Sequence, residues 1–96
     1  AEGAHVVTTD VWASMGQEAE AVARHRLFEP FRIDESIMAV TDAKSIFLHC
    51  LPVHRGEEVT SAVVDGPKSQ IWAEAENRLH AQKAILEWTM GGFSID

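Results

Sequence analysis

The fold of this chain is decided by one short stretch, Ser45-Ile46-Phe47-Leu48-His49-Cys50-Leu51-Pro52. Apolar residues lead into a His-Cys pair, and Pro52 lacks the N–H group that a central strand needs, so the stretch predicts a buried strand that stops abruptly. His49, Cys50 and the Leu51 backbone then lie at the carboxyl end of that strand, where open α/β sheets bind ligands. The only cysteine of the chain stands there, although a lone cysteine is more often a small buried hydrophobe.

The composition describes one small globular domain. Hydrophobic residues make up 46% of the 96 residues and charged residues 24%, which is ordinary for a folded chain. The net charge of −7 argues against nucleic acid and anionic membranes as partners. One cysteine allows no internal disulfide and fits a reducing compartment, so we expect a cytoplasmic protein. No apolar run approaches the roughly 20 residues that cross a bilayer, and the start has no signal-peptide pattern.

Strands and helices alternate around the opening stretch. We predict strands at 6–9, within 45–50 and at 69–73, and helices at 17–29, 34–40, 57–64 and 77–90. This alternation is typical of parallel strands joined by right-handed crossovers. The predicted fold class is therefore α/β, a partial doubly wound (Rossmann-like) parallel sheet of about three strands with flanking helices.

Such a sheet is thin for an independent domain. Parallel sheets need both faces covered, and an outer strand would lie unpaired. The first predicted strand also begins only six residues into the chain. We therefore expect either that this is a piece of a longer chain or that it associates with itself.

Each predicted strand is followed by polar residues that could carry chemistry. Asp10 and Ser14 follow the first strand, Cys50 ends the second, and Arg78 follows the third. In a parallel sheet these groups share one edge, where a carboxylate, a thiol and a guanidinium could handle an amine substrate beside an anionic one. Taken singly, each has a simpler interpretation: Asp10 caps a turn, Ser14 caps a helix, and Arg78 lies on a solvated helix face.

Metal and cofactor chemistry is poorly supported. Among the five histidines, His49 and His54 stand five residues apart across a proline, and no second cysteine completes a zinc set. A hydrolase pair of Cys50 and His49 is also disfavoured, because neighbouring strand residues point to opposite faces. No glycine-rich phosphate loop of a known type is present. We expect no metal and no cofactor.

Three segments together resemble the ornithine carbamoyltransferase family. They are residues 10–18 (DVWASMGQE), 49–59 (HCLPVHRGEEV) and 74–83 (EAENRLHAQK). The resemblance covers essentially the whole chain. It implies that 1–76 form the distal part of the ornithine-binding domain, and that 77–96 form a last helix packing on a carbamoyl-phosphate domain. Nothing here matches that domain's Ser-Thr-Arg-Thr loop or its His-Pro-x-Gln segment, so we expect the isolated chain to be inactive.

The resemblance also implies roles for single residues. Asp10, Ser14 and the Met15 backbone match the loop that holds ornithine, and Cys50 matches the cysteine near the reacting amine. The Leu51 carbonyl matches one that accepts a hydrogen bond from the carbamoyl nitrogen. A lowered pKa would make the Cys50 thiol more useful in drawing a proton from that amine.

Arg78 matches an arginine on the carbamoyl-phosphate side, so Asp10, Cys50 and Arg78 are the implied catalytic residues. The implied partners are ornithine, carbamoyl phosphate and further copies of the enzyme in a trimer. Two alternatives stay open. The substrate could be putrescine or N-acylated ornithine, although the 12–16 loop favours ornithine itself. From another class, the chain could be a non-catalytic piece that serves assembly.

Overall fold

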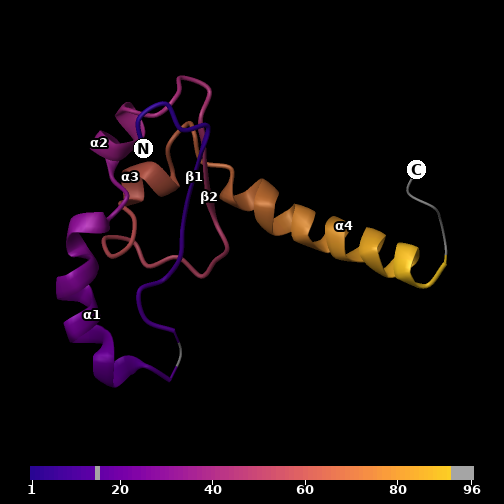
Figure 1. Ribbon diagram of the computed structural model, residues 1–96, viewed down its shortest axis with the longest axis horizontal. Coiled ribbons are helices and arrows are strands. Elements are labelled where there is room, and N and C mark those ends of the chain that lie inside the picture. Colours follow the sequence, from indigo (N-terminus) through magenta and orange to yellow (C-terminus); the bar gives the residue numbers. More distant parts are fainter. Residues whose placement is uncertain (15, 92–96) are drawn as a thin grey trace.

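The computed structural model describes residues 1–14 and 16–91. Its two strands, β1 (Val6–Thr9) and β2 (Ile46–His49), pair in parallel, with Val6 opposite Ile46 and Thr9 opposite His49. The helical elements are η1 (Glu18–Glu20), α1 (Ala21–Phe28), η2 (Glu29–Phe31), α2 (Glu35–Ala39), α3 (Ser61–Val64) and α4 (Ile71–Thr89). The predicted α/β class with a parallel sheet is confirmed (Figure 1).

The predicted third strand at 69–73 is wrong. Ser69 makes only an isolated parallel bridge to Phe47: the Phe47 N–H donates to the Lys68 carbonyl at 2.8 Å, and the Gln70 N–H donates to the Phe47 carbonyl at 2.9 Å. The chain then enters α4 at Ile71, earlier than predicted. A short apolar run cannot be assigned to strand or helix from periodicity alone, and here Ile71 fills the core from the first helical turn.

The predicted helices form with shifted limits. The 17–29 helix is divided among η1, α1 and η2, and the 57–64 helix is reduced to α3. Thr60 explains the second change, because its hydroxyl accepts from the Val63 N–H as an N-cap while the preceding residue Val59 bridges to Ile33. Asp34 caps α2, accepting from the Ile37 N–H at 3.0 Å.

The core lies on one side of the sheet, where Figure 1 shows α2 and α3. Phe47 on β2 is fully buried, together with Val59, Val64 and Ile71. Val7, Met38 and Val63 complete this cluster. Because strand residues alternate between faces, the face of β2 that buries Phe47 also buries His49, and Cys50 beyond it is exposed.

A lysine ties the turn before β2 to the rest of the domain. The Lys68 ammonium lies 2.8 Å from the Ser45 hydroxyl, 3.2 Å from the Thr41 hydroxyl, and 3.0 Å and 3.4 Å from the carbonyls of Asp42 and Met38. Ser45 and Thr41 are buried and also bond to each other at 2.6 Å. A half-buried ammonium surrounded by oxygen acceptors meets the requirement that buried charges be hydrogen-bonded.

Helix α4 projects away from the rest of the molecule (Figure 1). With α4 included, the molecule measures 48 × 38 × 20 Å along its principal axes. Only Ile71 is buried on this helix. Its other large apolar side chains are 51–68% exposed, namely Trp72, Leu79, Ile85, Leu86 and Trp88. Among the described residues, no helix combines the length and the hydrophobicity needed to cross a bilayer.

Candidate active site

The two parallel strands bring a carboxylate and a thiol into contact where they end. Asp10 follows β1 and Cys50 follows β2, so the register that pairs Thr9 with His49 also places these two residues side by side. The Cys50 thiol donates to Asp10 Oδ1 at 3.3 Å, and the Val11 N–H donates to the same oxygen at 2.7 Å. The contact joins residues forty positions apart in sequence.

The two groups shift each other's pKa in opposite directions. The Val11 N–H, followed by the Cys50 thiol, lowers the pKa of Asp10, so this carboxyl is ionised at neutral pH. Withdrawal from water, followed by the hydrogen bond to Asp10, raises the pKa of Cys50. Next to a carboxylate, the neutral S–H is the favoured form, so the lowered pKa that would help the thiol draw off a proton is not found, and Cys50 acts as a hydrogen-bond donor.

The pKa shift of Cys50 predicts slow alkylation at neutral pH. Because the thiolate is the reactive form, the rate at which iodoacetamide alkylates Cys50 should rise with pH. The curve of this rate against pH should lie at higher pH than the curve for a free cysteine. Asp10→Asn removes the neighbouring negative charge, so the curve should move back to lower pH. Peptide mapping by mass spectrometry follows the alkylation of Cys50 specifically. If the Asp10→Asn curve stayed in place or moved to higher pH, the assigned contact between Cys50 and Asp10 would be contradicted.

The loop after β1 is held on α1 by an aromatic anchor. Trp12 is 8% exposed; its ring packs edge-on against His25 at 5.3 Å between centroids and lies 6.2 Å from the Phe28 ring. The Arg24 guanidinium donates to the Trp12 carbonyl at 3.3 Å. Ser14 stands exposed beyond this anchor. Met15, the other residue of the predicted ornithine loop, lies outside the described residues.

Cys50 lies between two open clefts. One, of about 700 Å³, has a lining that includes Asp10, Ser14, Cys50, Leu51, His54 and Glu57. The other, of about 830 Å³, lies against α4 and includes Cys50, Glu74, Asn77 and Arg78. The structure thus brings Asp10, Ser14 and Leu51 into one cleft with Cys50, and Arg78 into the other. Asp10 and Arg78 do not line the same cleft.

Behind the site lies a buried pair that sequence reasoning missed. His49 is 1% exposed and Glu58 is 0% exposed, and His49 Nε2 lies 2.8 Å from Glu58 Oε1. The predicted opposite orientation of His49 and Cys50 is observed, but the acidic partner was not foreseen. A polar residue on the buried face of a strand needs a hydrogen-bond partner, and that requirement is the signal that could have pointed to Glu58.

The same region holds one set of side chains with metal-ligand character. Within residues 1–14 and 16–91, His54, Glu57 and Glu58 bring one ligand atom each to within 4.8 Å of one another. Glu57 also lies 3.3 Å from His25. The absence of a metal remains a prediction.

These features define a class: an α/β protein with open clefts at the carboxyl ends of parallel strands, the place where such folds bind ligands. Residues 1–89 match the family model described as "Aspartate/ornithine carbamoyltransferase, Asp/Orn binding domain". The chain therefore belongs to this family, and it corresponds to part of the domain that the description names.

Individual relatives agree with this assignment. Ornithine carbamoyltransferase of Halorhodospira halophila is 60% identical over 93 residues, which cover 97% of this chain and 31% of the relative. The solved ornithine carbamoyltransferase of Pyrococcus furiosus matches with a TM-score of 0.86 and 54% identity, over 97% of this chain and 30% of that one. A solved acetylornithine transcarbamylase complexed with acetylcitrulline matches with a TM-score of 0.71 and 40% identity, over 88% of this chain and 26% of that one. The chain spans less than a third of the length of these proteins.

Proposed function

We propose that the polypeptide containing this chain is an ornithine carbamoyltransferase, to which this chain contributes the distal part of the ornithine-binding domain. The proposed reaction transfers the carbamoyl group of carbamoyl phosphate to the side-chain amine of ornithine, giving citrulline and phosphate. The observation that carries the proposal is the contact of Cys50 with Asp10 at 3.3 Å, formed where two parallel strands end in one cleft. The 60% identity to a relative of that name supports it.

The chemistry of the reaction explains why these groups are suitable. The side-chain amine of ornithine is protonated at neutral pH and must lose a proton before its nitrogen can attack the carbamoyl carbon. A new N–C bond forms as the C–O bond to phosphate breaks. The ionised Asp10 attracts the substrate's positive charge, while the neutral thiol of Cys50 offers both a weak donor and a weak acceptor close to the reacting nitrogen.

The remaining residues are assigned by the same proposal. Ser14 and the Met15 backbone hold the amino-acid end of ornithine together with Asp10. The Leu51 carbonyl accepts a hydrogen bond from the carbamoyl nitrogen. Arg78 acts on the carbamoyl phosphate, since a fixed positive charge beside the developing oxyanion lowers the barrier. The position of Cys50 between the two clefts supports a reaction in which the two substrates meet there.

A comparison of substrates tests this proposal. The complete polypeptide should turn over ornithine with kcat/KM about 100-fold or more above those for putrescine and N-acetylornithine, because a site built to bond polar groups rejects analogues that lack or mask them. The 40% identity to an acetylornithine transcarbamylase makes N-acetylornithine the second candidate. A preference for it would replace the substrate assignment, and no citrulline-type product from any of the three would refute the proposed activity.

The domain proposal concerns α4. We propose that 1–76 belong to the ornithine-binding domain and that 77–96 pack on a carbamoyl-phosphate domain elsewhere in the polypeptide, although α4 itself is continuous through residue 76. The half-exposed apolar side chains along this helix support the proposal, since large exposed apolar patches mark contact surfaces. A non-catalytic assembly role draws on the same observation, and the substrate comparison decides between them.

Stability measurements on the complete polypeptide test the packing of α4. Trp88→Ala should lower its free energy of unfolding by about 3 kcal/mol, the usual cost of truncating a large buried side chain. The neighbouring Glu87→Ala is the matched control and should change it by less than about 0.5 kcal/mol. Denaturant titration measures both, and an equally small effect at Trp88 would show that the side chain stays in water.

The finer biological context follows from the same proposal. We place the complete enzyme in arginine biosynthesis, in the cytoplasm, as a trimer whose substrates are ornithine and carbamoyl phosphate. The acidic net charge of −7 supports the absence of nucleic-acid and membrane partners.

A further inference from the structure

Leu51 adopts an unusual backbone conformation at the centre of the site. Its φ of +56° makes it the only non-glycine residue with positive φ in the described part of the chain. For a bulky L-residue this left-handed conformation is unfavourable, and such residues persist where their surroundings determine the conformation and often mark functional sites. The conformation sets the direction of the Leu51 carbonyl and of the chain that carries Cys50.

A single hydrogen bond connects this backbone to the buried pair. The Leu51 N–H donates to His49 Nδ1 at 2.9 Å. Because Nδ1 accepts a hydrogen bond there, the imidazole carries its proton on Nε2, and this N–H donates a hydrogen bond to Glu58 Oε1 at 2.8 Å. His49 is therefore a neutral ring with a defined tautomer.

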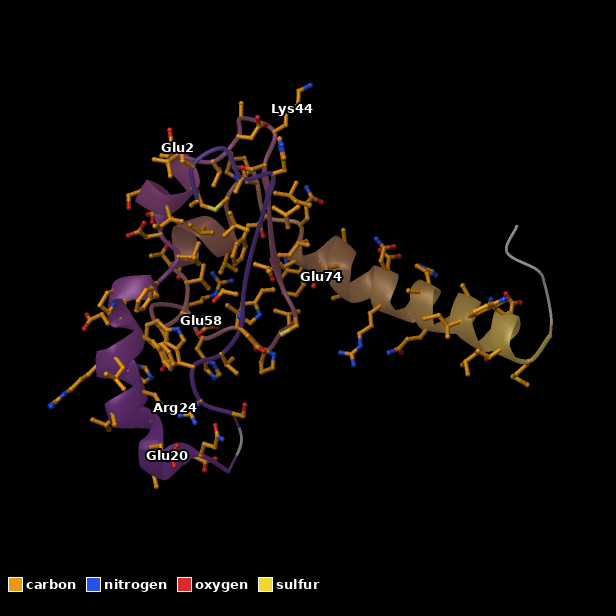
Figure 2. All side chains as sticks on the ribbon, viewed as in Figure 1. Glu2, Glu20, Arg24, Lys44, Glu58 and Glu74 are labelled. Carbon is orange, nitrogen blue, oxygen red and sulfur yellow. The ribbon has the colours of Figure 1, made fainter. Side chains whose placement is uncertain are left out.

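Glu58 and Glu74 fix the two ends of this arrangement. The Glu58 carboxylate also accepts from the His54 N–H at 2.8 Å, and it is fully buried. The His49 N–H donates to Glu74 Oε2 at 2.9 Å. Figure 2 shows Glu58 and Glu74 on opposite sides of the strands, with Glu74 at the beginning of α4. His49 is thus held both at its ring and at its backbone N–H, and the ring cannot turn without breaking a buried hydrogen bond.

We infer that His49 and Glu58 are positioning residues, which hold Leu51 in its left-handed conformation so that the Leu51 carbonyl and the Cys50 thiol face the site. The inference rests on the proposed function. His49 borders the cleft against α4 but not the cleft shared by Asp10 and Leu51, and because it is only 1% exposed it acts through the backbone rather than on the substrate. Its contribution belongs to the geometry of the reacting groups, where small displacements have large kinetic effects.

Two substitutions separate the two hydrogen bonds of the ring. His49→Asn keeps an acceptor near the position of Nδ1, whereas His49→Gln keeps a polar group near Nε2 and loses the acceptor for Leu51. In the complete enzyme, His49→Gln should lower kcat by about 30-fold, with KM for ornithine changed by less than about threefold. His49→Asn should keep kcat within about fivefold of the parent, by the same reasoning. Equal kcat values for the two variants would overturn the inference.

Glycine at position 51 supplies a second test. Glycine takes positive φ without support and keeps the backbone carbonyl, so Leu51→Gly should reduce the dependence on His49. In that background, His49→Gln should lower kcat by less than about threefold, a non-additivity expected only of coupled residues. If His49→Gln lowered kcat as much in the Leu51→Gly background as in the parent enzyme, His49 would serve general stability rather than the conformation of Leu51.

Glu58 provides an independent pair should the His49 variants fail to fold. Glu58→Gln retains an oxygen that can accept from His49 Nε2, and Glu58→Leu does not. We expect kcat to fall by about tenfold or more for Glu58→Leu relative to Glu58→Gln, because the orphaned ring loses its orientation; similar values would contradict the inference. An inactive parent enzyme would refute the proposed function. An active parent whose His49 and Glu58 variants keep the parental kcat would refute only the positioning role.

Discussion

Asp10→Asn in the complete polypeptide should lower kcat/KM for ornithine by about 1,000-fold, the range in which single groups of acid–base or electrostatic function contribute. The amide is nearly isosteric, and its oxygen can still accept from the Val11 N–H and the Cys50 thiol. What is lost is the negative charge, which the lowered pKa of Asp10 maintains at neutral pH. Steady-state citrulline formation over a range of ornithine concentrations measures the effect.

Asp65→Asn is the matched control for this experiment. Asp65 is exposed and paired with Arg55 at 2.6 and 2.9 Å, and it lines neither cleft beside Cys50. Exposed ion pairs contribute little, so kcat/KM should stay within about twofold of the parent. If Asp10→Asn kept more than a tenth of the parental kcat/KM, the carboxylate would have no direct part in the reaction.

The isolated 96-residue chain should form citrulline at a rate at least about 10,000-fold below that of the complete polypeptide at equal molar concentration. The chain covers 31% of a relative named ornithine carbamoyltransferase, and no segment resembles the family's phosphate-binding loop. Ornithine alone in the cleft has no activated carbamoyl group held beside it, so the rate gain from bringing two reactants together is absent.

A contaminating host enzyme is the main source of error in that measurement. Isolated chains carrying Cys50→Ala, purified in the same way, reveal it, because a contaminant does not respond to the substitution. Citrulline formed by the parent chain but not by this variant would show that the chain catalyses the reaction alone.

The sequence predicted the elements in which local and tertiary preferences agree. The β-branched run at 6–9 and the apolar run before His49 became β1 and β2, and the helix predicted at 34–40 formed as α2. The segment 69–73 was assigned wrongly because its local pattern is ambiguous. Only the packing of Ile71 into the core beside Phe47 determines that a helix begins there.

The candidate site was predictable to a similar extent. That Asp10 and Cys50 follow parallel strands was enough to place them together, since strand ends share an edge. The direction of the Cys50 pKa shift was not predictable without knowing that its nearest partner is a carboxylate. The link from Leu51 through His49 to Glu58 depends on how the loop after β2 folds back, and no sequence spacing encodes that path.

The oxygen cage around Lys68 has a practical consequence for handling the protein. An amine held by two hydroxyls and two carbonyls is shielded from acylating reagents, whereas Lys44 and Lys83 are exposed. Lysine labelling followed by peptide mass spectrometry therefore reports on structural integrity at one position. Acquisition of label at Lys68 marks molecules in which the turn before β2 has opened.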